Sequence, residues 1–134
     1  MLKIDTYPDA HFAGMYGYEH HDDPSCVKSR TSYVINVANC PVMWQSKLRT
    51  ETVLSNMEAE ILAISNCARE LIPIMQMVEF LGPAAGLPVD CTSMHVCIHE
   101  DNAGALILAA NLPPQYTPRS KNNHIKTIWF RELI

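Results

Sequence analysis

The sequence predicts an α/β fold: a mixed β-sheet, with three antiparallel strands and then a parallel one, flanked by helices. Two observations carry this prediction. Three β-rich segments (2–10, 31–38 and 42–46) come first, and a long helical pattern then separates them from an apolar strand at 94–99. A helix between two strands of one sheet favours their parallel, right-handed pairing, whereas a short connection favours an antiparallel hairpin.

The composition indicates one globular domain over residues 1–134. Hydrophobic residues make up 48% of the chain and charged residues 18%. No uninterrupted apolar run reaches the roughly 18–20 residues that cross a bilayer, and no apolar signal core follows the N-terminus, so we expect neither a membrane partner nor secretion. Five cysteines without a CxxC pair favour reduced thiols inside a cell. The net charge of −4 argues against nonspecific coating of nucleic acid but leaves room for a cation-bridged site.

Turn-forming residues delimit the first three strands. The strand at 2–10 should end near Asp9, because Pro8 cannot donate to a ladder: either the pairing stops there or one edge of the strand is unpaired. The polar stretch 17–26 predicts a loop. Residues 39–41, Asn-Cys-Pro, predict the hairpin connection between the second and third strands.

The clearest helix covers residues 55–82. Ser55 or Asn56 can cap its start, and Gly82-Pro83 should stop it. Apolar residues at helical spacing form its predicted core face: Met57, Ile61, Ile64, Ala68, Leu71 and Met75.

The remaining predictions concern a proline inside the long helix and the elements that follow the fourth strand. Pro73 should kink or split the long helix. After the strand at 94–99, residues 102–111 predict a short helix, 112–123 an irregular, mildly basic loop, and 124–134 a further amphipathic helix.

Three carboxylates are candidates for a shared site. Asp9 and Asp101 end the first and fourth strands, and parallel strands bring their carboxyl ends to one edge of a sheet. The helix adds Glu58 or Glu60, which differ by about 200° around its axis and so cannot face the same site. Glu60 lies beside the buried face and Glu58 is the better capping residue, so Glu60 is favoured.

Converging carboxylates repel one another unless a cation neutralises them. Oxygen ligands without sulfur favour magnesium or manganese, and two such ions, about 3.5–4 Å apart, support in-line displacement at phosphorus. Simpler explanations stay open at this point. Any single acid is more often a solvated surface group, and Asp101 is well placed to cap the helix that follows it.

Five motifs occur in order along nearly the whole chain. They are TYPDAHFAG (6–14), KSRTSYV (28–34), VMWQSKLRTETVLSNMEAEILAIS (42–65), HEDNAGAL (99–106) and TPRSKNNHIKTIWFREL (117–133). Together they closely resemble the ribonuclease H domain of copia-type LTR retrotransposon polyproteins. The resemblance implies a ribonuclease H-like fold and metal-dependent cleavage of the RNA strand of RNA–DNA hybrids. It also implies the reverse transcriptase portion of the same polyprotein as a partner, within a cytoplasmic particle or the nucleus.

The resemblance assigns the site residue by residue. Asp9, in the PDA motif, matches the first catalytic and metal-binding acid. Glu60 matches the helix acid, because the family pattern of an acid, two residues and an alanine fits Glu60-Ile-Leu-Ala63. Asp101, in EDN, matches the third acid, and Glu100 is then expected to point off the opposite face of its strand.

Three features depart from the family pattern. Its fourth carboxylate is expected after a further strand, and this chain ends at Ile134 before that final strand and helix, as in a C-terminally truncated domain. His124 stands in a motif that often carries an Asp, and His11 stands where a second acid usually follows PDA. These departures keep open an alternative function: a catalytically inactive ribonuclease H-like remnant that acts as a nucleic-acid-binding or structural module.

Other polar residues are candidates for contacts with nucleic acid, although each is more often simply solvated. Asn102 could hydrogen-bond a sugar hydroxyl and so help to distinguish RNA from DNA. His99, two residues from Asp101, is a candidate for proton transfer, and His124 is a second auxiliary candidate. The candidates for phosphate contacts are Lys47, Arg49, Arg119 and Lys121.

A zinc site is the competing metal hypothesis. His95, Cys97, His99 and Asp101 alternate along one strand face and offer thiol, imidazole and carboxylate ligands. Neighbouring positions on one strand rarely give tetrahedral geometry without ligands from elsewhere, so a partly buried strand face is the favoured interpretation. The His-His-Asp-Asp stretch at 20–23 is likewise more simply explained as an exposed loop.

Overall fold

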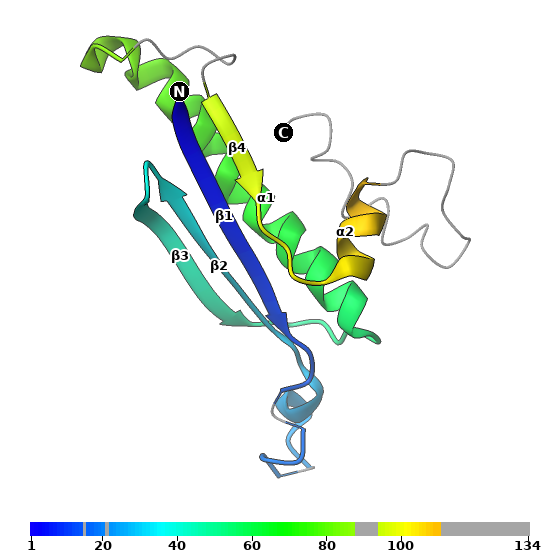
Figure 1. Ribbon diagram of the computed structural model, residues 1–134. Coiled ribbons are helices and arrows are strands. Elements are labelled where there is room, and N and C mark those ends of the chain that lie inside the picture. The colour runs from blue at the N-terminus through cyan, green and yellow to red at the C-terminus, as the bar shows by residue number, and fades with distance from the viewer. Residues whose placement is uncertain (15, 21, 88–93, 111–134) are drawn as a thin grey trace.

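A four-stranded mixed sheet forms the centre of the described part of the chain. The computed structural model describes residues 1–14, 16–20, 22–87 and 94–110, so the predictions for 112–123 and 124–134 lie outside it. Within these residues the strand order is β3-β2-β1-β4, and helix α1 lies along one face of the sheet (Figure 1). The strands are β1 (Leu2–His11), β2 (Arg30–Val37), β3 (Cys40–Leu48) and β4 (Met94–Ile98).

The pairing confirms the predicted fold class. β1 pairs antiparallel with β2, and β2 pairs antiparallel with β3, whereas β1 pairs parallel with β4. The parallel register joins Leu2–Thr6 to Met94–Ile98, so Pro8 lies beyond it on an edge that β4 does not pair. The pairing with β2 continues to His11, two residues past the predicted strand end at Asp9. Pro8 therefore lies where β1 is paired on one edge by β2 and is unpaired on the other edge. This is the second of the two arrangements that the sequence allowed.

The hairpin between β2 and β3 turns earlier than predicted. Val37 pairs with Cys40, so the connection is Ala38-Asn39 and not residues 39–41. Both turn residues have positive φ, 51° and 63°, which suits a two-residue connection whose twist matches that of the strands. Pro41 belongs to β3, where an edge strand with a bulge opposite Ile35 and Asn36 tolerates its missing N–H.

Helix α1 (Asn56–Leu81) begins and ends where the sequence predicts. The Ser55 hydroxyl accepts a hydrogen bond from the Glu58 N–H at 3.1 Å, and the Glu58 carboxylate accepts one from the Leu54 N–H at 3.0 Å. The sequence predicts that Pro73 kinks or splits the helix; α1 runs through it as one helix, so the split is wrong and the kink stays a prediction. It ends at Gly82, ahead of the short 3₁₀ turn Pro83–Ala85. A second 3₁₀ turn, Pro24–Val27, lies in the predicted loop, and α2 (Ala103–Ala110) follows β4.

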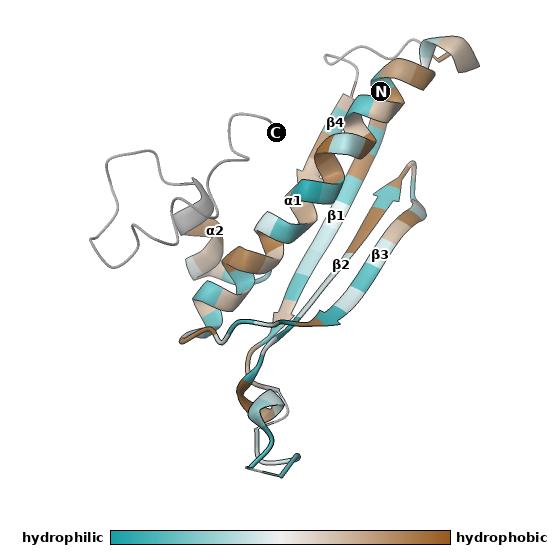
Figure 2. Cartoon of the chain, turned by 180° about the vertical axis from the view of Figure 1, so that it is seen from behind, coloured by the Kyte–Doolittle hydropathy of each residue, from teal (hydrophilic) through white to brown (hydrophobic). Residues whose placement is uncertain are grey.

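The core lies between α1 and the sheet, where α1 packs mainly on β1 and β2; Figure 2 shows the molecule from the side of α1. Most of the predicted core face of α1 is buried, but Met57 is 40% exposed, so its assignment to the core is wrong, and Met75 is only partly buried. Among the described residues α1 is the one helix whose length and composition alone would allow a membrane crossing, and one face of it packs on β1 and β2. The buried apolar residues on α1 and the sheet include Ile4, Tyr33, Ile35, Ile61, Ile64, Cys67, Ala68 and Leu71.

Candidate metal and nucleic-acid site

Three acids from three elements meet at one end of the sheet. Asp9 lies near the end of β1, Asp101 follows β4, and Glu60 lies in the second turn of α1. Each offers a carboxylate oxygen, and these oxygens lie within 4.8 Å of one another. The parallel pairing of β1 with β4 brings the two aspartates to the same edge, and the packing of α1 on that sheet delivers the glutamate.

The position of Glu60 is unfavourable for an ionised carboxylate. It is only 5% exposed, and its Oε2 is buried without a hydrogen-bond partner among the described residues. Burial raises the pKa of Glu60 to about 7, and the negative charges of Glu100, Asp9 and Asp101 add to the rise, against a hydrogen bond with the Ala10 backbone. Either a proton or a bound cation is therefore needed to make this position favourable near neutral pH.

Glu100 lines the same cleft as Asp9 and Asp101 and interacts with their charges, so the expectation that it points off the opposite face is wrong. Its Oε1 accepts a hydrogen bond from the Asn102 N–H at 2.9 Å, and its Oε2 is buried without a partner in the described chain. Burial, with the charges of Asp101 and Asp9, raises its pKa to about 7, although the Asn102 N–H opposes the rise. The expectation failed because β4 ends at Ile98: the two-residue alternation of a strand does not extend to Glu100.

Asn102, and not Asp101, caps α2. The Asn102 Oδ1 accepts a hydrogen bond from the Ala105 N–H at 2.9 Å, and the Asn102 carbonyl accepts one from Leu106 at 2.9 Å. The simpler explanation of Asp101 as a helix cap therefore does not hold. Asp101 is exposed and lines an open cleft with Tyr7, Pro8, Asp9, His99 and Glu100.

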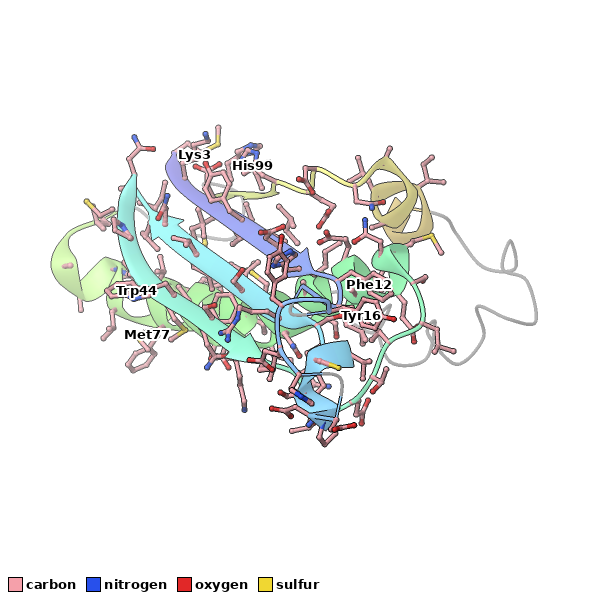
Figure 3. The ribbon with its side chains drawn as sticks, turned by 90° about the horizontal axis from the view of Figure 1, so that it is seen from below. Lys3, Phe12, Tyr16, Trp44, Met77 and His99 are labelled. Carbon is pink, nitrogen blue, oxygen red and sulfur yellow. The ribbon has the colours of Figure 1, made fainter. Side chains whose placement is uncertain are left out.

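His99 is held at the lip of this cleft by residues that the sequence analysis did not single out. Its Nε2 lies 2.7 Å from Oδ1 of Asp5, and Lys3 Nζ lies 3.2 Å from the other oxygen of that carboxylate. The imidazole stacks on Tyr7, with ring centroids 4.6 Å apart and an interplanar angle of 9°. Figure 3 shows Lys3 and His99 side by side. The hydrogen bond from His99 and the ammonium of Lys3 lower the pKa of Asp5, although burial acts against them.

Three of the four zinc ligands proposed along β4 separate into two groups, and His95 joins neither group among the described residues. Asp101 joins Asp9 and Glu60, whereas Cys97 and His99 lie with Asp5, all three offering ligand atoms within 4.8 Å of one another. No local pattern marks Asp5 as a partner of Cys97, because the two residues are far apart in the chain and adjacent only through the parallel register. In the loop at 20–23, His20 Nδ1 and Asp22 Oδ2 lie 3.4 Å apart and both side chains are exposed, as expected of a surface loop.

Two of the predicted phosphate contacts share a polar cleft. Lys47 and Arg49 line it together with Arg69, Asn66 and Thr31 among others. An Arg49 Nη1 donates to the Thr31 hydroxyl at 3.5 Å, but Arg49 Nε is buried and meets no acceptor in the described part of the protein. Arg119, Lys121 and His124 lie outside the described residues.

The fold class follows from the sheet: a mixed sheet of three antiparallel strands and one parallel strand, with flanking helices, is compatible with a ribonuclease H-like fold. Over 128 residues, 96% of this chain, the sequence is 27% identical to the retrovirus-related Pol polyprotein from transposon TNT 1-94 of Nicotiana tabacum. The chain covers 8% of that polyprotein, and the similarity supports an origin in a retrotransposon polyprotein. No protein-family profile and no solved structure matches the chain.

Proposed function

We propose that this chain is a metal-dependent endonuclease domain that cleaves the RNA strand of RNA–DNA hybrids. The observation that carries the proposal is the convergence of Asp9, Glu60 and Asp101, whose oxygens lie within 4.8 Å of one another. The 27% identity to a retrovirus-related Pol polyprotein supports an origin in a retrotransposon polyprotein, the setting in which the motifs resemble a ribonuclease H domain. On this proposal residues 1–134 form one ribonuclease H-like domain that works inside the cell, in a particle or the nucleus, with the reverse transcriptase portion of its polyprotein.

The acid cluster fits one or two divalent cations of the hard, oxygen-binding class. Glu60 is buried with an oxygen that lacks a partner among the described residues, and its ionised form is disfavoured by the acids around it. Asp9, Glu60 and Asp101 would hold magnesium or manganese, with Glu100 near enough to contribute charge. The cations would supply Lewis acidity for in-line displacement at phosphorus. The chain itself contributes the fixed placement of the carboxylates and the open cleft through which a phosphodiester reaches them.

The polar cleft around Arg49 is the proposed contact for the nucleic-acid backbone. Lys47, Arg49 and Arg69 concentrate positive charge in a protein whose net charge is −4, so the attraction is local. The Arg49 side chain lines this cleft, and a guanidinium is well suited to bind phosphate oxygens. Asn102 uses its Oδ1 to cap α2, so its amide NH₂ is the group that would reach a sugar hydroxyl.

A cleavage assay tests the proposal directly. We expect the wild-type protein to cut the labelled RNA strand of a hybrid with magnesium or manganese, and to stop when EDTA is added. Asp101→Asn should lower the rate by about 10²-fold or more, because it removes one ligand charge. Asp22→Asn, which changes an exposed loop acid, is the matched control and should cut like wild type.

Two results would decide against the enzyme. If wild type cuts no better than Asp101→Asn, this chain is not a hybrid nuclease. Hybrid binding that persists without cleavage, and that weakens in Arg49→Ala, would instead support the inactive nucleic-acid-binding remnant. The charged cleft around Arg49 is the feature that favours this second function, because it does not depend on the acid cluster.

A further inference from the structure

A thiol, an imidazole and a carboxylate meet on the face of the sheet opposite α1. Ile4 packs with Cys67 and Leu71 of α1, so strand alternation turns Asp5 to the other face. Asp5 is paired with Cys97 in the parallel register of β1 and β4, and the His99 ring lies beside the Asp5 carboxylate. The ligand atoms of Asp5, Cys97 and His99 all lie within 4.8 Å of one another.

The donor set has the chemistry of a zinc site and not of a magnesium site. Zinc accepts thiolate, imidazole and carboxylate ligands at about 2.0–2.3 Å, which puts neighbouring ligand atoms in a tetrahedral site about 3.3–3.8 Å apart. The present separations, up to 4.8 Å, reach that range through small side-chain movements on a fixed backbone. Sulfur is a soft ligand that magnesium and manganese do not select, so this group differs in kind from the cluster of acids.

The surroundings of the three residues favour a metal over an ordinary hydrogen-bonded pair. Asp5 is 2% exposed, and Lys3 holds its Oδ2, so Oδ1 is left facing His99. A hydrogen bond to the second oxygen of a ligating carboxylate is a common feature of metal sites, because it fixes the orientation of the carboxylate. The His99 side chain is 41% exposed, which leaves a path for an ion and room for a water.

We propose that Asp5, Cys97 and His99 form a zinc-binding site with three protein ligands and one open position. Zinc takes the place of the hydrogen bond between Asp5 and His99, and the Cys97 thiol loses its proton on binding. The ion joins β1 to the end of β4 and fixes His99, which lines the cleft beside Asp9 and Asp101. This site stands independently of the proposed nuclease activity, since it shares no ligand with the acid cluster.

Cobalt(II) is the probe for the test, because a thiolate ligand gives it a charge-transfer absorption that carboxylates cannot give. The purified chain, kept reduced, is titrated with cobalt and then with zinc. We expect one equivalent of cobalt to produce the thiolate band and one equivalent of zinc to remove it. Cys97→Ser should lose the band, whereas Cys40→Ser, which changes an exposed cysteine on β3, should keep it. A wild-type protein without the band, or a Cys97→Ser protein that retains it, overturns the proposal.

A second measurement separates this site from the acids and does not rely on the thiolate band. Zinc at saturating concentration should raise the melting temperature of wild type and of Asp101→Asn by several degrees, because a ligand that binds only the native state stabilises it. It should not do so for Cys97→Ser, whose fold is checked by circular dichroism. Loss of the zinc effect in Asp101→Asn, with its retention in Cys97→Ser, would assign the ion to the acid cluster and overturn the proposal.

Discussion

At the scale of single residues, Glu60 lies where its negative charge lowers the stability of the metal-free fold. The carboxylate is almost fully buried, and the nearest charged groups are other acids. Burying a charge without a partner is costly, so a residue chosen for stability alone at this position would be neutral. The arrangement is favourable only when a cation or a proton is bound, and this is the property expected of a metal ligand.

Glu60→Gln should therefore stabilise the metal-free protein while it weakens metal binding. The substitution keeps the shape and removes the buried charge. We expect the free energy of unfolding to rise by about 1–2 kcal/mol at pH 8 and to change little at pH 4.5, where Glu60 is protonated anyway. Urea denaturation in EDTA at both pH values measures this difference. Glu58→Gln is the control, because its side chain still accepts a hydrogen bond from Leu54; an equal gain there would contradict the argument.

The pH dependence of stability follows from the raised pKa values of Glu60 and Glu100. Both values rise from 4.5 to about 7 on folding, so the folded state holds more protons than the unfolded state between these limits. Stability from these groups is complete below about pH 4.5 and is lost as the pH rises to about 7. The urea midpoint of metal-free protein should fall across this window, and magnesium should restore it at pH 8. A double variant, Glu60→Gln with Glu100→Gln, should flatten the curve; an unchanged slope would show that other groups control it.

The site residues that could be predicted from the sequence are those that a local pattern marks. Asp9 and Asp101 follow from strand ends, and Glu60 follows from helical periodicity, so local patterns were sufficient for them. Glu100 was misplaced because the strand stops two residues before it. The Asp5–His99 contact spans 94 residues of sequence and depends on the strand register, which no local pattern supplies.

At the scale of elements, the β2–β3 hairpin is strained at a residue that could be changed. Ala38 adopts φ 51° and Asn39 φ 63°. Asn tolerates the left-handed region, whereas an alanine there brings its Cβ too close to the following carbonyl oxygen. The sequence prediction chose residues 39–41 because Asn and Pro mark turns, but the twist of the strands selected a two-residue connection that includes Ala38.

Ala38→Gly should stabilise the protein by about 0.5–1 kcal/mol. Glycine removes the left-handed penalty, and the added freedom of the unfolded chain offsets part of the gain. Thermal denaturation measures the effect. The matched variant Ala84→Gly, in an exposed 3₁₀ turn without positive φ, should be neutral or slightly destabilising. Equal losses in both variants would show that the turn carries no strain.

At the scale of the whole molecule, two groups of like charge lie apart from each other in the described residues. The acids gather at one end of β1 and β4, while Lys47, Arg49 and Arg69 line the polar cleft between β3 and α1. Among the described residues, a polyanion therefore has two candidate places to bind: the cationic cleft, and the acids once they hold cations. The order of the elements and the mixed sheet could be predicted from the sequence, because helix and strand periods differ clearly along this chain. The charge distribution could not, because it depends on how α1 lies on the sheet.

Binding of hybrid should consequently depend on salt through the cationic cleft. Each neutralised phosphate contributes about 0.9 to the slope of log affinity against log salt. We expect Arg49→Ala to make this slope shallower by about 1, measured by fluorescence anisotropy in calcium or without metal to prevent cleavage. Arg30→Ala, which removes a cation from outside that cleft, is the control. A change in affinity with no change in slope would exclude a phosphate contact by Arg49.

The parallel pairing of β1 with β4 also sets when the acids first meet during folding. β1 is synthesised first, but its neighbour β4 comes after the hairpin and α1, so closing this pair costs the entropy of a long loop. The hairpin and the start of α1 can form from local contacts while Asp9 and Asp101 are still far apart. The repulsion between the acids is then felt only at the last docking step. A cation that binds there would hold the finished domain together by slowing its unfolding and would do little to hasten its assembly.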